Sequence, residues 1–146
     1  MNTLTTLAFS AVAATVSFAI LPSAASAQSE MAYPEKCKTE GMKTDMSKND
    51  MSTGGMPMGE MSDYQKASMD GMKDMHMNMM QGMMKKDADV SFVCGMIAHH
   101  MGAISMSEVE LKYGDNEEAK QMAQKIIDAQ KKEIEEMSKW VDKEAK

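Results

Sequence analysis

The segment from residue 89 to 113 constrains the fold most, because it carries apolar side chains on two opposite sides of one helix. At about 100° per residue, one side collects Val90, Val93, Cys94, Ile97, Met101, Ile104 and Leu111. Nearly the opposite side collects Phe92, Met96, His99, Ala103 and Met106. A helix that is apolar all round is usually buried on both sides. This segment is therefore predicted to be covered by the rest of a helical bundle or by a second subunit.

Helix signals before and after this segment predict an all-α fold. Ser62 followed by Gln65 is a capping-box pattern, and the methionines after it recur at spacings of three and four. Asp87 or Asp89 can cap the middle helix, and Asp115 with Glu118 three residues on is expected to open the last. The predicted helices span 62–86, 89–113 and 116–143. Their short connections predict an antiparallel up-and-down bundle.

The start of the chain has the features of an export signal. Residues 1–27 carry no charged side chain and contain an apolar run that ends in Ala25, Ser26 and Ala27, as secretory signal peptides do before their cleavage site. We therefore predict a signal peptide over 1–27, a Met-rich flexible tail over 28–61 and a helical metal-binding domain over 62–146. The mature protein is expected to be periplasmic or secreted, without a stable membrane anchor.

The net charge limits the classes of binding partner, and the two cysteines bear on the redox environment of the protein. The formal net charge of −6 argues against nucleic acid and acidic membrane surfaces as partners. Thiols outside the cytoplasm tend to be oxidised, and Cys37 and Cys94 are the only two cysteines. A disulfide between them is predicted to tie the tail to the second helix.

Methionine is the most enriched residue, with 21 in 146 positions, and each of the three histidines has methionine within one helical turn. Thioethers combined with imidazole suit Cu(I) and, by the same chemistry, Ag(I); Cu(II) is a further candidate ion. The predicted metal ligands are Met96, His99, His100 and Met106 on the second helix and Met72, His76, Met79, Met80 and Met83 on the first. For any single helical methionine the alternative is gap-filling in the core. Gln130 and Glu133 are expected to hydrogen-bond to His99 or His100 from the third helix.

Two stretches also carry a family resemblance. "DVSFVCGMIAHHMGAISM" followed by "MAQKIIDAQKKEIEEMSKW" resembles the helical core of the CopM-like periplasmic copper-binding proteins, part of a domain-of-unknown-function group with a ferritin-like four-helix arrangement. The resemblance covers roughly 62–143 and implies exported copper binding in copper tolerance. Ala98 stands where many relatives have proline, and Met101 where they often have glutamine. The fourth helix of that arrangement would come from the tail or a partner, or be absent.

Other functions fit the residues less well. A ferritin-like di-iron enzyme needs Glu-x-x-His pairs, but Lys73, Met96 and Ile97 precede the three histidines by three residues. No nucleophile with a paired base, phosphate loop or cofactor fingerprint was found, so no enzymatic activity is predicted. A Met-rich helical protein-interaction module without a metal role is the alternative. The expected partners are copper ions and a copper-exporting or copper-accepting protein, with a homodimer as a further option.

Overall fold

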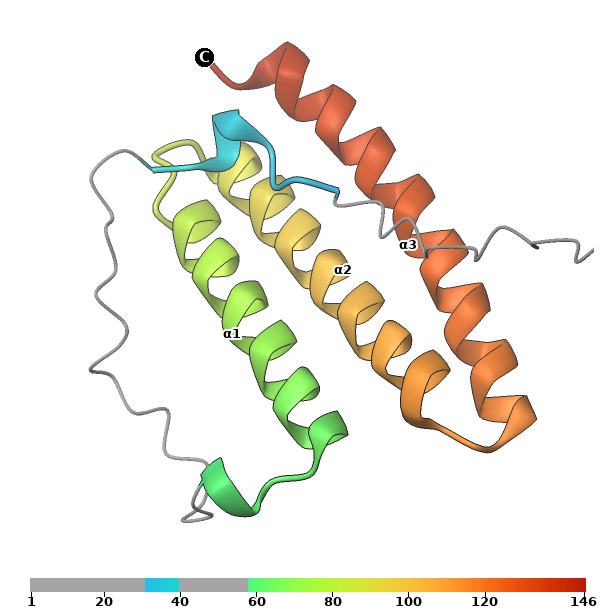
Figure 1. Ribbon diagram of the computed structural model, residues 1–146. Coiled ribbons are helices and arrows are strands. Elements are labelled where there is room, and N and C mark those ends of the chain that lie inside the picture. The colour runs from blue at the N-terminus through green and yellow to red at the C-terminus, as the bar shows by residue number, and fades with distance from the viewer. Residues whose placement is uncertain (1–30, 40–57) are drawn as a thin grey trace, which may run out of the picture. The chain divides into compact units, whose positions relative to one another are not determined.

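Three long helices run through the part of the chain that the computed structural model describes, residues 31–39 and 58–146. They are α1 (Asp63–Met83), α2 (Ala88–Tyr113) and α3 (Glu117–Glu144), and two short 3-10 turns, η1 (Glu35–Cys37) and η2 (Met58–Glu60), precede them (Figure 1). These described residues contain no strand, so the all-α prediction is confirmed. The predicted signal peptide and residues 40–57 of the predicted tail lie outside the described residues.

Each helix begins at a side chain that satisfies its first free N–H groups. Ser62 and Gln65 form the predicted capping box of α1. Asp87, rather than Asp89, caps α2 and accepts hydrogen bonds from two backbone N–H groups, those of Asp89 and Val90. The prediction for α3 was wrong by one residue, because the side chain of Asn116 accepts from the Ala119 N–H and caps the helix in place of Asp115. These caps fix the starts of all three helices locally.

The first helix ends earlier than predicted. α1 stops at Met83 instead of 86, and the N–H of Lys85 turns back to the carbonyl of Gly82. Because Asp87 already caps α2, residues 84–87 are needed to reverse the chain. Lys85 and Lys86 therefore lie in the connection.

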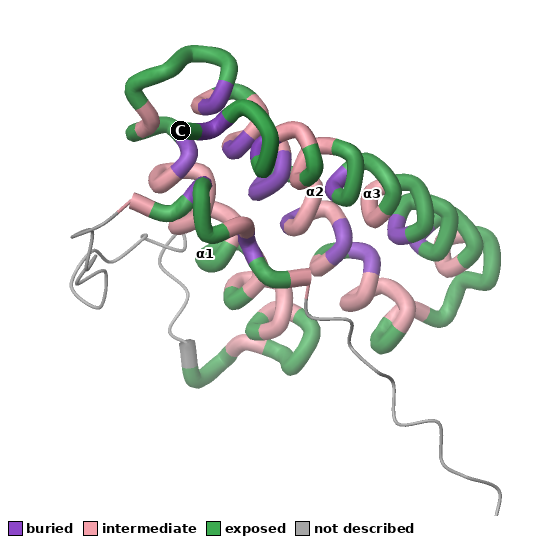
Figure 2. Tube along the Cα trace, turned by 90° about the horizontal axis from the view of Figure 1, so that it is seen from above, coloured by how far each residue is buried: buried purple, intermediate pink, exposed green. Residues whose placement is uncertain are grey.

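The middle helix, α2, packs against both α1 and α3, which have little contact with each other, so the three form a layer (Figure 1). Buried residues follow the lines along which the helices meet (Figure 2). The predicted core side of α2 is confirmed, since Val90, Cys94, Ile97 and Ile104 are buried. Residues Ile127, Ile134 and Val141 of α3 belong to the same core. By length and composition α2 could also span a membrane, but a central helix of a protein core has the same composition.

Glycines allow α1 and α2 to approach closely and fix their register. A Cβ atom on Gly82 would lie 2.8 Å from the backbone nitrogen of Gly95 and 2.9 Å from the Tyr33 hydroxyl. Further along, Gly71 faces Ser105, and the side chain of Met75 covers Gly102. The two helices are therefore antiparallel, with backbone against backbone at one end of their contact.

We expect Gly82→Ala to lower the free energy of unfolding by about 1–3 kcal/mol, because the added methyl group must push two backbones apart. Gly95→Ala is the matched control, since nothing lies within 4 Å of its added Cβ atom. That change should raise stability by roughly 0.5–1 kcal/mol through helix propensity alone. Urea denaturation followed by circular dichroism measures both. A stabilising Gly82→Ala would show that the helices are not in contact at this point.

The segment 31–39 lies against all three helices. The predicted disulfide between Cys37 and Cys94 is confirmed, with a Cα–Cα distance of 5.4 Å. The Tyr33 hydroxyl donates to the Cys94 carbonyl over 3.1 Å, and burial raises the pKa of Tyr33 to about 12. The ammonium of Lys36 donates to two carbonyls at the end of α3, those of Asp142 and Ala145, each over 2.8 Å, where a cation suits the helix dipole. The disulfide is consistent with an exported protein.

Candidate functional site

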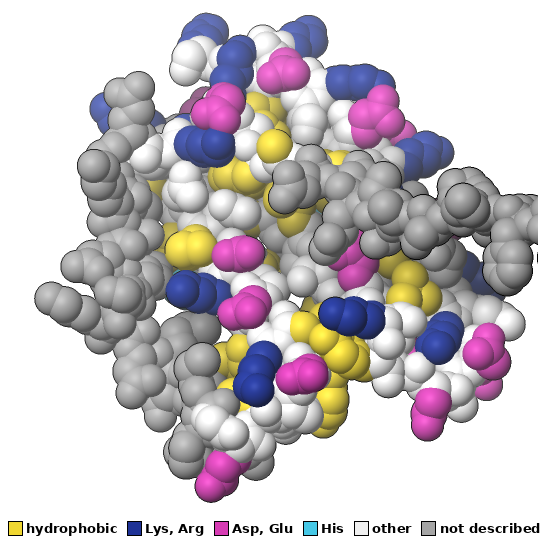
Figure 3. All heavy atoms as spheres, viewed as in Figure 1, with side chains coloured by type: hydrophobic (Ala, Val, Ile, Leu, Met, Phe, Trp, Pro, Cys, Tyr) yellow, Lys and Arg dark blue, Asp and Glu magenta, His cyan; other side chains and the backbone are white. Residues whose placement is uncertain are grey.

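The side of the helical layer away from segment 31–39 is apolar and exposed. The segment contacts α1 at the Gln81 carbonyl and α2 at the Cys94 carbonyl. Met83 follows Gln81 by two residues, and Phe92 precedes Cys94 by two. Each therefore lies on nearly the opposite side of its helix from segment 31–39. Six large side chains share this side, and each is 42–67% exposed: Met72 and Met83 of α1, Phe92 and Met106 of α2, and Met122 and Ile126 of α3. We call these six residues the open face. Figure 3 shows the other side of the layer, where Lys side chains and Asp or Glu side chains surround the hydrophobic atoms.

A histidine pair with one hydrogen bond to α3 lies beside the open face. The Nε2 atom of His100 is 2.7 Å from Oε2 of Glu133, and the His100 side chain is only 12% exposed. Its other ring nitrogen, Nδ1, is buried without a hydrogen-bond partner. Because a carboxylate can only accept, a neutral His100 donates through Nε2 and keeps its lone pair on Nδ1. A metal-binding histidine is commonly oriented by such a carboxylate.

The neighbouring ring of His99 lies at a distance that fits a shared ion. The His99 and His100 ring centroids are 5.9 Å apart. A metal held by one nitrogen of each ring at about 2 Å would separate the centroids by roughly 5 to 6 Å. Met96 precedes both histidines by one turn and is half-buried, so its thioether can reach the same region. The structure thus places the rings of His99 and His100 side by side, and helical spacing puts Met96 one turn before them.

The fourth predicted ligand on α2 is separated from this cluster. Met106 follows His99 by two helical turns, about 10.5 Å of rise, and is exposed. One ion cannot be bound by both within a single chain. Met106 shares its side of the helix with His99 and Phe92, at spacings of seven residues.

The predicted ligands on α1 are divided between the surface and the core. The contacts of Gly71, Met75 and Gly82 with α2 place His76 about level with Met101. His76 and Met80 are half-buried, Met72 and Met83 are exposed, and Met79 packs against the hydrophobic core. The spacing rules missed Met75, whose thioether lies over Gly102 at the interface. The only sequence signal for this contact is Gly102 on the facing helix.

Oxygen and nitrogen ligands alone do not build a site in the described residues. Across 31–39 and 58–146, no group of three or more His, Cys, Asp or Glu side chains is placed to hold an ion. An ion at His99 and His100 would therefore find no third His, Cys, Asp or Glu ligand in these ranges. The predicted hydrogen bond from α3 comes from Glu133, while Gln130, which is half-exposed, bonds to neither histidine.

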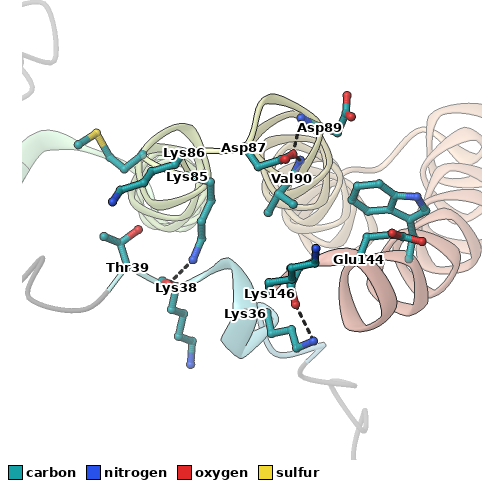
Figure 4. Close-up of a pocket in the computed structure, with 13 residues that line it drawn as sticks. Lys36, Lys38, Thr39, Lys85, Lys86, Asp87, Asp89, Val90, Glu144 and Lys146 are labelled. Atoms are coloured by element: carbon teal, nitrogen blue, oxygen red, sulfur yellow. Dashed lines mark hydrogen bonds between the residues drawn. The ribbon is translucent and has the colours of Figure 1, made fainter.

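A separate hollow of about 720 Å³ lies at the end of the layer near the chain reversal (Figure 4). Its lining is rich in lysine: Lys36, Lys38, Lys85, Lys86 and Lys146. Lys36 and Lys85 are hydrogen-bonded to backbone carbonyls, so part of this charge supports the fold. Asp87, Asp89 and Glu144 also line the hollow, so its charge is mixed, and its lining includes none of the predicted metal ligands.

Together the layer of three helices and its exposed methionines define a Met-rich, all-α protein. Residues 21–141 match the family described as Domain of unknown function (DUF305). The chain belongs to this family. No curated protein matches the sequence. The family match spans the stretches that resemble the CopM-like proteins and does not itself assign a metal.

Proposed function

We propose that this chain is an exported copper-binding protein, periplasmic or secreted. It captures or buffers Cu(I), and Ag(I) by the same chemistry, and contributes to copper tolerance. The observation that carries the proposal is His100, whose Nε2 is bonded to Glu133 while its buried Nδ1 has no partner. A buried polar atom without a partner costs about 1–3 kcal/mol. Metal ligation at Nδ1 removes that cost.

Soft ligands are what the chain offers to a metal. Both cysteines are used in the disulfide, so no thiolate competes with methionine and histidine. Met72, Met83 and Met106 are exposed on the same side as the histidine pair, and thioethers favour Cu(I) over harder ions. The net charge of −6 attracts cations in general. A copper-exporting or copper-accepting protein is the partner that this role requires, and no enzymatic step is assigned to the chain.

Native mass spectrometry of the mature protein tests this proposal directly. We expect Cu(I) and Ag(I) to remain bound after buffer exchange and Zn(II) to be lost. A variant with His99→Ala and His100→Ala should lose the tightest Cu(I), while His76→Ala, which leaves the pair on α2 intact, should keep it. Equal Cu(I) occupancy in the wild type and in the double variant would exclude the histidine pair as ligands.

A Met-rich helical interaction module is the second candidate function, and the open face favours it. Contiguous exposed apolar surface commonly marks a protein contact, and methionine adapts to varied partners. This function requires no metal. Partner binding that is unchanged by a Cu(I) chelator would support it.

A further inference from the structure

The outer side of α2 has the spacing of a helix-pairing seam. Phe92, Met96, His99, Ala103 and Met106 follow one another at spacings of four and three, as the a and d positions of a heptad repeat do. No charged residue occurs from Val90 to Ser107. Phe92, His99 and Met106 are exposed, so this seam lacks a partner within the described chain.

The exposed apolar area on this side approaches what a stable dimer needs. At roughly 200 Å² for a fully exposed large side chain, the six residues of the open face together expose on the order of 600 Å². A standard interface buries about 800 Å² per partner, and the largest apolar patch on a typical monomer is about 300–600 Å². His99, Met96 and Ala103 add to the area of the open face.

We propose that two copies of the chain pair through this side, with the two α2 helices antiparallel. Antiparallel pairing sets a positions against d positions. When the two helices are centred on Met101, Met96 lies opposite the partner's Met106 and His99 lies opposite the partner's Ala103. The seam is uncharged, so its two copies do not repel each other. Residues 40–57 match it poorly because they carry five charged side chains and three glycines or prolines beyond Gly41: Glu40, Lys43, Asp45, Lys48 and Asp50, with Gly54, Gly55 and Pro57.

This pairing allows Met106 to bind a metal together with a histidine of the other chain. Within one chain Met106 lies two turns from His99, whereas the partner's Met106 lies level with Met96, one turn from His99. Each of two equivalent sites is then formed by Met96, His99 and His100 of one chain and by Met106 of the other. The shared metal site rests on the proposed function; the dimer does not.

Sedimentation equilibrium of the metal-free mature protein, from about 1 to 100 µM, tests the dimer. We expect a dimer for the wild type and a monomer for Met106→Glu. Met84→Glu is the matched control, because Met84 is 56% exposed and Met106 54%, but Met84 lies in the connection between α1 and α2. It should remain dimeric. Phe92→Glu must dissociate the dimer as well, and circular dichroism confirms that each variant folds. A monomeric wild type, or a dimeric and folded Met106→Glu, overturns the proposal.

Mixed dimers test whether the partner supplies a ligand. His99→Ala and Met106→Leu each remove one ligand from both sites of their own dimer, and leucine keeps the apolar contact. A heterodimer isolated with two different tags restores one of the two sites, so it should bind one more tight Cu(I) than either parent dimer. No recovery overturns the shared site. If the wild type binds no Cu(I), the proposed function fails while sedimentation still decides the dimer.

Discussion

Replacing Cys37 and Cys94 together by alanine is expected to lower the free energy of unfolding by about 4 kcal/mol. The disulfide joins residues 57 positions apart, and the loss of loop-closure entropy in the unfolded chain gives this magnitude for a loop of that length. Both cysteines are fully buried, so alanine avoids adding a polar atom to the core. Urea denaturation followed by helical circular dichroism measures the change.

The wild type under reducing conditions is the control for the double alanine variant, because it loses the crosslink without losing the sulfur atoms. We expect most of the destabilisation to appear in both. A loss below about 1 kcal/mol in both cases would contradict the entropic argument. Segment 31–39 would then be held mainly by its hydrogen bonds to α1, α2 and α3.

Glu133→Ala is expected to weaken Cu(I) binding at the histidine pair by about 10- to 100-fold, the usual cost of removing the carboxylate that orients a metal-binding histidine. Without Glu133, nothing from α3 fixes the tautomer or the ring orientation of His100. The dissociation constant is measured by competition with a chromophoric Cu(I) chelator. The change in net charge alone should be far smaller, because exposed charges are screened.

Glu136→Ala provides the matched control for charge and helix propensity. Glu136 is exposed on α3 and lies three residues after Glu133, and the structure gives it no hydrogen bond to His100. Its removal should leave the Cu(I) affinity within about twofold, since it changes only a screened surface charge. Equal affinities for Glu133→Ala and Glu136→Ala would show that His100 binds no copper or needs no support from α3.

The sequence by itself determined the three helices, the starts of two of them, the core sides and the disulfide. Ser62 with Gln65 and the apolar stripe through Ile127, Ile134 and Val141 are local signals, because capping and helical periodicity depend only on residues within a few turns. The cysteine pair followed from there being only two cysteines in a chain with a predicted export signal. Periodicity also showed that α2 has two apolar sides.

Only the tertiary structure decided which side of α2 is covered, because periodicity says which residues share a side and not which surface meets them. The register between α1 and α2 depends on Gly82 against Gly95 and on Met75 over Gly102, contacts between residues that no local pattern relates. That register packs Met79 against the core and leaves Met72 and Met83 exposed. The position of α3 brings Glu133 to His100, and the rise of a straight helix keeps Met106 away from His99. The sequence determines the chemistry of each side chain, but the packing of rigid helices determines which side chains come into contact.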